Sequence, residues 1–405
     1  MDSVKIGKYL AKLRKYYKIT QDELALKLGV SRQAVSRWET GNSLPDVELL
    51  YKISELYGVT MDNIVHADVS SLKLREHKLL VDDRFCPKRI FIIGCGRWGT
   101  FLAWYLDKLG HKVSLYGREN SVNMKRLQEE RKNDYLMLSE SVKLTTRLEE
   151  ATEADYLVIS ISSQSLQEIA LKLKQLELKE KTIVLCMKGI EIHFGRRLSQ
   201  IVDDTLDHSN RSAVWLGPGH VQDFVHGIPN CMVIDGNDEF IKNELITAFS
   251  SDLIRFYYGT DLVGNEIGAA AKNVIGIAAG MLDGLGRSTL KGALMARGSR
   301  EIGRLIKAMG GKEYSVYGLC HLGDYEATIF SKYSQNRCYG EAIVSGKSYD
   351  KLAEGVHTVM ALRNLGKNYG VELPICEAVY QILYNGQQPE SILEWLFRRS
   401  LKNEF

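Results

Sequence analysis

The sequence has neither a long apolar run nor closely spaced cysteines. No stretch approaches the roughly 18 consecutive apolar residues of a membrane-spanning helix. The first residues are polar and periodic, without the apolar run and small-residue cleavage site of a secretory signal. The 7 cysteines are scattered, with no CxxC pair, which argues against a disulfide framework and against a zinc site. We therefore expect a cytoplasmic protein with no membrane insertion and no bound metal.

Neither basic nor acidic residues are in large excess. The chain has 53 lysines and arginines against 50 aspartates and glutamates, a formal net charge of +3, so it is not a basic coat for nucleic acid along its whole length. It has no internal repeat and no low-complexity tract. The 405 residues are 45% hydrophobic and 25% charged, which is ordinary for a globular protein. This length exceeds a single core and predicts about two or three domains.

Hydrophobic periodicity changes along the chain and divides it into segments. Residues 1–66 have the pattern of short helices separated by tight turns, and residues 67–87 have no strong periodicity, which predicts a linker that is helical in part. Over 88–258, short β-rich apolar runs alternate with helical patterns, as in a mostly parallel, doubly wound α/β sheet. Only helical patterns follow, so residues 259–405 are predicted to form an all-α domain. The apolar runs are 88–94, 112–117, 156–162, 182–187, 213–217 and 230–236.

Residues 20–42, TQDELALKLGVSRQAVSRWETGN, have the pattern of two short helices joined by a tight turn. Gly29 supplies the turn because glycine accepts a positive φ, and Ser31 can cap the second helix by accepting a backbone N–H. The apolar residues on the inward faces are Leu24, Ala25, Leu28, Ala34, Val35 and Trp38. The outward face of the second helix then carries Arg32, Gln33, Ser36 and Arg37. Arginine pairs with guanine and glutamine with adenine in the major groove, so this face is suited to reading DNA.

The first 40 residues also carry a local positive charge. They contain nine lysines and arginines against four acidic residues, a difference of +5 that the whole-chain balance hides. The pattern TQxELAxKLGVSxxxVSxWExG resembles the Cro/C1-type (Xre-like) helix-turn-helix family. The resemblance implies binding of double-stranded DNA by a homodimer that spans two half-sites. The residues implied to touch phosphates are Gln21, Ser31 and Asn42, and those implied to read bases are Arg32, Gln33 and Arg37. The alternative is a helical bundle for protein contacts or dimerisation, with solvated arginines.

Residues 94–99, GCGRWG, match the G-x-G-x-x-G pattern of dinucleotide-binding turns. They directly follow the apolar run KRIFII and open a helical pattern, which is the context that the motif requires. Gly94 makes the turn, Gly96 lets the backbone approach a pyrophosphate, and Gly99 lets the helix pack on the strand. These residues predict a Rossmann dinucleotide site. The alternative is a glycine turn with no ligand.

The end of the second predicted strand bears on the choice of cofactor. An NAD-selective site has Asp or Glu there, about 20 residues after the glycines. This chain has Tyr116, Gly117 and Arg118, with no carboxylate until Glu119. Because Arg118 can pair with a 2′-phosphate, we expect NADP(H) as the preferred cofactor and NAD(H) as the alternative. A solvated loop arginine is the competing interpretation.

Polar residues also stand inside small, apolar surroundings further along the chain. Lys188 follows an apolar run, and Lys272 and Asn273 lie inside a helical pattern of alanine, glycine, isoleucine and valine. A buried lysine is costly unless it is paired, and such lysines are often functional. The alternative is a lysine at a helix end whose amine reaches solvent. The segment 321–340 carries further polar candidates, namely Asp324, Thr328, Asn336 and Arg337.

Together these segments resemble the NAD(P)-dependent glycerol-3-phosphate dehydrogenases over residues 88–405. The shared motifs are GxGxWGT at 94–100, KGIE at 188–191, GP at 217–218, EIGxAxKNVIxIAAGxxDGLG at 266–286, LGD at 322–324, SxNRxxG at 334–340, EG at 354–355 and GVELPI at 370–375. The resemblance implies a Rossmann domain followed by an all-α substrate domain. It also implies reversible reduction of dihydroxyacetone phosphate to sn-glycerol 3-phosphate.

The same resemblance assigns roles to individual residues. The implied catalytic residues are Lys272, which meets the charge on the ketone oxygen, with Asn273 and Asp324 orienting it. The implied substrate-binding residues are Lys188, Gly217, Gly219, Thr328, Ser334, Gln335 and Asn336. The implied cofactor-binding residues are Gly94, Gly96, Arg97, Trp98, Gly99, Arg118, Lys188, Val221, Leu352 and Glu354.

Two positions depart from the family pattern. Gln335 stands where the family usually has an arginine for the substrate phosphate and the cofactor, and a neutral amide is no substitute for that charged clamp. Arg337 is a candidate to compensate. Gly219 stands where the family usually has Ser or Thr, with His220 beside it.

These departures leave two main hypotheses for function. The first is an active enzyme that carries its own DNA-binding module, and Lys188, Lys272, Asn273 and Asp324 favour it. The second is a transcriptional regulator whose dehydrogenase-like domain senses NADPH or a sugar phosphate, and Gly219 and Gln335 favour it. A structural fusion with neither activity fits poorly with two intact sets of motifs.

Overall fold

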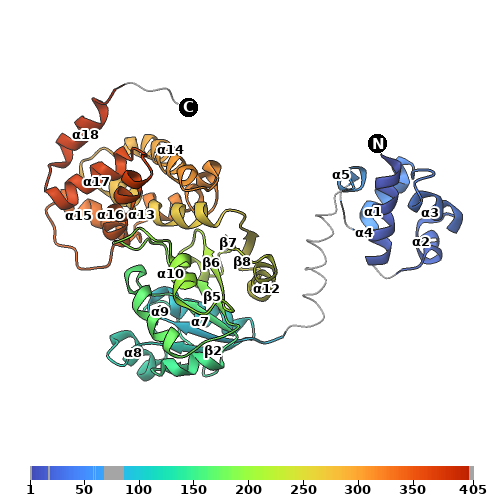
Figure 1. The fold of residues 1–405 in the computed structure, drawn as a ribbon, viewed down its shortest axis with the longest axis horizontal. Coiled ribbons are helices and arrows are strands. Elements are labelled where there is room, and N and C mark those ends of the chain that lie inside the picture. Colours follow the sequence, from blue (N-terminus) through green and yellow to red (C-terminus); the bar gives the residue numbers. More distant parts are fainter. Residues whose placement is uncertain (1, 17–18, 58, 60, 68–85, 401–405) are drawn as a thin grey trace. The chain divides into compact units, whose positions relative to one another are not determined.

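The computed structural model describes residues 2–16, 19–57, 59, 61–67 and 86–400. The chain forms two compact units, Met1–Phe85 and Cys86–Phe405 (Figure 1). The linker predicted at 67–87 lies almost wholly outside the described residues. None of the helices in the described ranges is long and apolar enough to cross a membrane. All 7 cysteines are free thiols.

The described part of the first unit is helical. Its helices are α1 (Ser3–Tyr16), α2 (Gln21–Leu28), α3 (Arg32–Glu39), α4 (Val47–Tyr57) and α5 (Met61–Val65). They pack around one apolar core, to which every one of these helices contributes buried side chains. Representative members are Tyr9, Leu24, Val35, Ile53 and Ile64.

The turn between α2 and α3 forms as the sequence predicts. Gly29 has a φ of 69°, the left-handed conformation that ends α2. The Ser31 side chain accepts a hydrogen bond from the backbone N–H of Ala34 and so caps α3. Val35 and Trp38 are buried, which turns the opposite side of α3 outward.

The second unit begins with one eight-stranded sheet in the order β3-β2-β1-β4-β5-β6-β7-β8. Neighbouring strands run parallel except β6 and β7, which are antiparallel. The strands are β1 (Arg89–Ile93), β2 (Lys112–Tyr116), β3 (Lys143–Thr145), β4 (Tyr156–Ile159), β5 (Thr182–Leu185), β6 (Arg211–Leu216), β7 (Asn230–Gly236) and β8 (Ile254–Tyr258). The predicted apolar runs form β1, β2, β4, β5, β6 and β7. The edge strands β3 and β8 were not predicted. β3 has only 3 residues, whereas β8 (IRFYY) was missed although its alternation of buried and exposed residues is typical of an edge strand.

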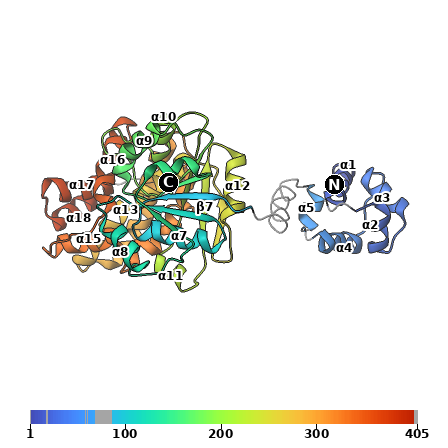
Figure 2. The same ribbon diagram turned by 90° about the horizontal axis from the view of Figure 1, so that it is seen from below.

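Helices cover both faces of this sheet (Figures 1 and 2). One face packs against α7 (Arg97–Lys108), α8 (Val122–Glu130), α11 (Val221–Val225) and α12 (Glu239–Phe249). The other packs against α9 (Leu166–Gln175) and α10 (Leu198–Thr205). Ile90 and Ile92 of β1 belong to the first core, whereas Phe91 and Ile93 belong to the second. This is the doubly wound arrangement that the sequence predicts, with the central strand buried on both sides.

The rest of the second unit is helical, and α13 (Leu262–Gly284) runs through its middle, buried along most of its length. Around it lie α14 (Lys291–Ala308), α15 (Gln335–Val344), α16 (Glu354–Asn368), α17 (Pro374–Asn385) and α18 (Pro389–Phe397). At Gly280 of α13 a Cβ atom would collide with the carbonyl of Arg337, and at Gly340 of α15 one would collide with the carbonyl of Ile277. These glycines let the two helices approach closely.

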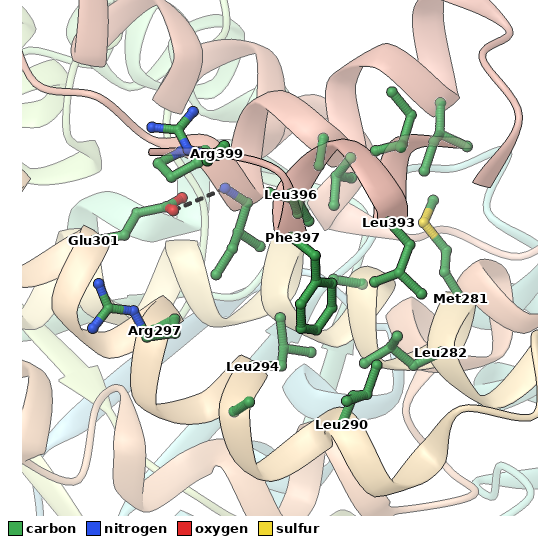
Figure 3. A pocket seen from close by; sticks show the side chains of 18 of the residues that line it. Met281, Leu282, Leu290, Leu294, Arg297, Glu301, Leu393, Leu396, Phe397 and Arg399 are labelled. Atoms are coloured by element: carbon green, nitrogen blue, oxygen red, sulfur yellow. Dashed lines mark hydrogen bonds between the residues drawn. The ribbon is translucent and has the colours of Figure 1, made fainter. Parts of the chain in front are cut away.

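A cavity of about 450 Å³ lies between α13, α14, α17 and α18 (Figure 3). Apolar side chains line one end of it, among them Met281, Leu282, Leu290, Leu393 and Phe397. Glu301 lies toward the other end, beside Arg297 and Arg399. Its buried carboxylate accepts hydrogen bonds from the backbone N–H groups of Ile375 (2.8 Å) and Cys376 (3.0 Å) at the start of α17. The charge at this end of the cavity therefore anchors a helix terminus.

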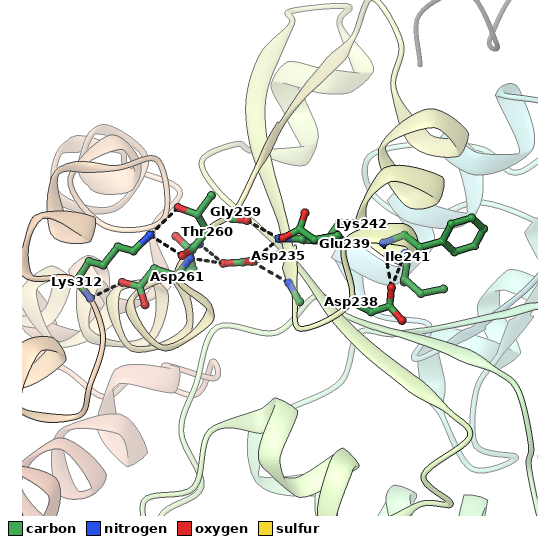
Figure 4. A network of polar contacts seen from close by, with 12 residues as sticks. Asp235, Asp238, Glu239, Ile241, Lys242, Gly259, Thr260, Asp261 and Lys312 are labelled. Atoms are coloured by element: carbon green, nitrogen blue, oxygen red, sulfur yellow. Dashed lines mark hydrogen bonds and ion pairs between the residues drawn. The ribbon is translucent and has the colours of Figure 1, made fainter. Parts of the chain in front are cut away.

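A buried polar network joins the sheet to the start of α13 (Figure 4). Asp235 of β7 accepts hydrogen bonds from the backbone N–H of Asp261 (3.1 Å) and the side-chain amide of Asn265 (2.7 Å). Lys242 of α12 is buried, with its Nζ 3.8 Å from the Asp235 carboxylate and donating to the carbonyl of Gly259 at 2.9 Å. Because Asp261 is the N-cap of α13, this network fixes where α13 begins relative to the sheet.

Candidate active site

A cleft of about 700 Å³ lies at the carboxyl ends of the parallel strands and reaches α13. This is where doubly wound sheets bind their ligands. The predicted site residues that line it are Gly94, Gly96, Arg97, Trp98, Arg118, Lys188, Gly219, Val221, Lys272, Asn273, Asp324, Thr328, Ser334, Gln335, Asn336, Leu352 and Glu354. Two predicted residues, Gly99 and Gly217, lie beside the cleft without lining it. Residues from five strand ends and several helices of the second unit are thus brought together.

The glycine turn has the shape that a dinucleotide requires. Gly94 has a φ of 116°, and a Cβ atom there would collide with the carbonyl of Ser160. A Cβ on Gly99 would collide with the carbonyl of Gly94, so α7 packs directly on the turn. Gly96 is the N-cap of α7, makes no side-chain cap, and has no heavy atom within 4 Å of a Cβ position. The first N–H groups of α7 therefore open onto free space, which fits a pyrophosphate.

The part of the cleft beside the end of β2 carries one basic side chain. Arg118 is exposed directly after β2 and lines the cleft with Ser121 and Asn123. Glu119 is not among the lining residues. The carboxylate typical of a site for the ribose 2′-hydroxyl is therefore missing directly after β2, although Glu168 of α9 lines the cleft within electrostatic range of Arg118.

Two lysines share one buried carboxylate on the opposite wall. Lys272 Nζ lies 2.8 Å from Asp324 Oδ2 and donates to Thr328 Oγ1 at 2.7 Å. Lys188 Nζ lies 2.7 Å from the same oxygen and donates to the carbonyl of Gly217 at 2.6 Å. Lys272 and Asp324 are both buried, and a buried charge is costly unless it is paired. Their ion pair gives each of these charges a partner.

Burial gives Lys272 an unusual proton affinity. Desolvation lowers its pKa to about 8, the Lys188 ammonium acts in the same direction, and the Asp324 carboxylate opposes both. An amine that titrates near neutral pH can both give and take a proton, as a catalytic acid and base must.

A chain of amides holds this centre in place. Asn273 donates from Nδ2 to the carbonyl of Lys188 at 2.8 Å, and Asn336 donates to Asn273 Oδ1 at 3.0 Å. Asn336 Oδ1 in turn accepts from the backbone N–H of Gly355 at 2.9 Å. The chain connects the end of β5, α13, α15 and α16 across the cleft.

Glu354 is tied to the sheet. Its carboxylate accepts a hydrogen bond from Ser163 Oγ at 2.6 Å, from the loop after β4. Leu352, by contrast, is exposed at the rim of the cleft. Both residues flank the opening of the cleft on the side of α16.

The departures from the family pattern have local explanations. Gln335 accepts from the Tyr349 hydroxyl at 2.5 Å. Arg337 does not compensate for it, because Asp283 at 2.7 Å and Glu341 at 3.3 Å hold its guanidinium and it does not line the cleft. Gly219 has a φ of 145°, and a Cβ there would collide with the Phe224 ring, so this backbone has no room for a side chain.

Several cleft residues were not identified from the sequence. They are Ser160, Ser162, Ser165, His220 and Tyr333. For His220 a usable signal exists, since it directly follows the glycine segment at the end of β6. The others follow from the three-dimensional fold alone.

In the first unit, α3 presents the predicted reading face. Arg32, Gln33 and Arg37 are exposed and Ser36 is half-buried. Arg32 lies 3.6 Å from the exposed Asp22 carboxylate.

The residues implied to touch phosphates differ in their surroundings. Gln21 donates to Glu39 at 2.8 Å, and Glu39 also binds Arg14 at 2.6 Å, so Gln21 is part of a contact between helices. Ser31 is exposed, although its hydroxyl accepts the capping N–H of α3. Asn42 is exposed and donates to Thr40 Oγ1 at 3.0 Å.

A glycine turn at the carboxyl end of a parallel strand, with a buried and paired lysine in the same cleft, is typical of a dinucleotide-binding oxidoreductase. Comparison with known proteins identifies the family. The family model described as NAD-dependent glycerol-3-phosphate dehydrogenase N-terminus matches residues 89–241, and its C-terminus counterpart matches 261–394. A helix-turn-helix model matches residues 10–64.

Individual relatives agree with the family models. Glycerol-3-phosphate dehydrogenase [NAD(P)+] from Clostridium botulinum strain Alaska E43 is 37% identical over 330 residues, 78% of this chain and 99% of that protein. A protein of the same name from Salinibacter ruber is 36% identical over 329 residues, 78% of this chain and 96% of that protein. The structure of glycerol-3-phosphate dehydrogenase from Coxiella burnetii superposes with a TM-score of 0.73 at 28% identity, covering 77% of this chain and 99% of that one.

The chain therefore belongs to the NAD-dependent glycerol-3-phosphate dehydrogenase family. It is an NAD(P)-dependent oxidoreductase of that family that carries a helix-turn-helix domain near its N-terminus.

Proposed function

We propose that the chain reversibly reduces dihydroxyacetone phosphate to sn-glycerol 3-phosphate, with NADPH as the preferred cofactor. The observation that carries this proposal is the buried Lys272, paired with Asp324 in the cleft that also holds the glycine turn. The domains would be a DNA-binding module at 1–66, a linker at 67–87, a Rossmann domain at 88–258 and a substrate domain at 259–405.

The residues of the cleft suit this reaction. A bound nicotinamide supplies the hydride for the ketone carbon. Negative charge on the ketone oxygen must be met by a positioned cation or proton donor. The Lys272 ammonium donates its proton to that oxygen in reduction, and the free amine takes it back in oxidation. Asp324 holds Lys272 and Lys188 toward the same point, and Asn273 fixes the backbone that carries Lys188.

Lys272→Met tests the reaction. Following NADPH absorbance with dihydroxyacetone phosphate, we expect the variant to lose about 100-fold to 10,000-fold in kcat, the usual contribution of a general acid. Lys291→Met is the matched control, because Lys291 is equally buried and paired with Asp283 at 2.7 Å but lies outside the cleft. It should keep kcat even if it is less stable. A wild-type chain that binds NADPH but does not turn over would favour the alternative function, a regulator that senses NADPH or a sugar phosphate.

The preference for NADPH rests on Arg118 and on the missing carboxylate after β2. Arg118→Ala should weaken NADPH binding by about 10-fold to 100-fold, the range for a lost charged hydrogen bond, and leave NADH binding unchanged. Arg126→Ala is the control, since Asp134 holds Arg126 at 2.6 Å outside the cleft. Fluorescence titration with both cofactors measures the effect. A wild-type chain that binds NADH more tightly would contradict the preference.

A second function, sequence-specific DNA binding by a homodimer, is supported by the exposed Arg32, Gln33 and Arg37 on α3 and by the helix-turn-helix match. On a duplex selected from a random library, Arg37→Ala should lower specific affinity by about 1–3 kcal/mol at fixed salt. Lys52→Ala is the control, because Lys52 is exposed on α4 and paired with Glu48. An unchanged binding curve for Arg37→Ala would exclude it as a base-reading residue. Selected sites should contain two half-sites about one helical turn apart.

A further inference from the structure

Few basic side chains of the described cleft wall are available to bind the phosphate of a substrate. The basic side chains among its described lining residues are Arg97, Arg118, Lys188, His220 and Lys272. Lys188 and Lys272 share the carboxylate of Asp324, and Arg118 lies at the end of the cleft beyond β2. Arg97 begins α7 at the glycine turn and is already assigned to the cofactor, so His220 is the remaining basic side chain of the described lining to meet a further anionic group near the reacting lysine.

His220 is placed unlike an ordinary structural histidine. It is the N-cap residue of α11 and half-buried, and its ring packs edge-on against the Tyr333 ring with the centroids 5.9 Å apart. Its Nε2 atom is buried and has no hydrogen-bond partner among the residues that the structure describes. A buried polar atom without a partner is uncommon and costs free energy unless a ligand satisfies it.

The charge state of His220 in the empty cleft follows from its surroundings. Burial lowers its pKa, and the positive charges of Arg97 and Lys272 act in the same direction, while Asp223 and Asp324 oppose them. The ring is therefore neutral near pH 7 and can carry one N–H, on Nε2. In the tautomer with the proton on Nε2, it is a hydrogen-bond donor within the electrostatic range of both Arg97 and the reacting lysine.

We propose that His220 determines specificity for the phosphate group, donating from Nε2 to a phosphate oxygen of the substrate beside Arg97. This assignment rests on the proposed function. It accounts for the two departures in the chain, because Gln335 brings no charge and Gly219 brings no hydroxyl to this part of the cleft. The neighbouring Tyr333 holds the imidazole by ring contact, and so places Nε2 without consuming its hydrogen-bonding capacity.

His220→Phe tests the assignment, because phenylalanine keeps the ring contact with Tyr333 and removes the nitrogen. Calorimetry measures binding of dihydroxyacetone phosphate to the full chain saturated with NADP+, a pair that cannot react. We expect the Kd to rise by about 10-fold to 100-fold, the range for a lost hydrogen bond to a charged group. His220→Gln, which restores an N–H donor, should recover part of the loss.

The matched control is His226→Phe. His226 is the C-cap residue of the same helix, exposed and outside the cleft, so its replacement should leave the Kd unchanged. NADP+ binding should be the same in all variants, which also checks that the cleft is folded. In steady-state assays with NADPH, His220→Phe should lower kcat/KM for dihydroxyacetone phosphate but not for unphosphorylated dihydroxyacetone.

Three outcomes would overturn the assignment. His220→Phe would bind dihydroxyacetone phosphate as tightly as the wild type, or lose both ketones equally, or lose NADP+ affinity instead. In each of these cases a wild-type chain that reduces dihydroxyacetone phosphate keeps the proposed function standing. A wild-type chain that neither binds nor reduces dihydroxyacetone phosphate would refute the proposed function and this assignment together.

Discussion

At the scale of single residues, the protonation of Lys272 should set the pH dependence of the reaction. Its pKa of about 8 means that the ammonium is lost as pH rises through that value. We expect kcat/KM for reduction to fall above about pH 8, and kcat/KM for oxidation to rise toward the same pH, because oxidation needs the free amine. Stopped-flow or steady-state profiles in both directions measure this.

Lys272→Arg separates this lysine from other titrating groups. An arginine stays protonated throughout the accessible range, so any residual reduction should lose its decline near pH 8. A decline that persists in Lys272→Arg would assign the titration to another residue. Lys272 also makes stability depend on pH. Its pKa in the folded chain lies below the ordinary value of 10.5, so the unfolded chain binds more protons between these two values and the free energy of unfolding rises with pH there.

At the scale of elements, the start of α17 depends on one buried carboxylate. Glu301→Ala would leave the N–H groups of Ile375 and Cys376 buried without acceptors. Each such group costs about 1–3 kcal/mol, so hydrogen exchange at the start of α17 should accelerate by about 10-fold or more. Glu301→Gln keeps one acceptor oxygen and should lose less. Glu390→Ala, at an exposed glutamate in the first turn of α18, should change nothing, and equal effects in both alanine variants would contradict this account.

Sequence periodicity predicted the elements that are long or strongly patterned. The buried strands β1, β4 and β5 are continuous apolar runs, and α13 is a long apolar helix interrupted by Lys272 and Asn273, which is why that part of the site could be predicted. The edge strand β3 has only 3 residues and depends on pairing with a neighbour, whereas the alternation in β8 was a local signal that could have identified it.

The direction of a side chain was harder to predict than its position in the sequence. Arg337 was a candidate to replace the missing arginine at Gln335, but Asp283 of α13 draws it away from the cleft. That contact exists because glycines let α13 and α15 pack closely, a property of the packed helices rather than of the 334–340 segment. The role proposed for His220 likewise depends on Tyr333 and Arg97, which are distant in sequence.

At the scale of the whole second unit, catalysis requires that α13 keep its place relative to the sheet. Lys272 lies on α13, and the glycine turn lies after β1, so their separation is set where α13 leaves the sheet. The network of Asp235, Asp261 and Lys242 does this (Figure 4). Asp235 is 1% exposed and Lys242 is 2% exposed. Lys242 also pairs with Glu239 at 2.6 Å, so it keeps a carboxylate partner when Asp235 is removed, whereas removing Lys242 takes away the cation nearest to the buried Asp235 charge.

Asp235→Ala should cost about 2–6 kcal/mol of unfolding free energy and also lower kcat, because the backbone N–H of Asp261 and the side-chain amide of Asn265 each lose a buried acceptor at the start of α13, at about 1–3 kcal/mol apiece. Replacing both charged partners, as Asp235→Asn with Lys242→Met, should be less destabilising than Asp235→Ala, since an amide oxygen still accepts at the start of α13 and the Glu239 carboxylate that loses Lys242 is exposed to water. Urea unfolding of the second unit and NADPH turnover give the two readouts. A double variant as unstable as Asp235→Ala would show that the junction depends on the geometry of the carboxylate itself and not on the pairing of its charge.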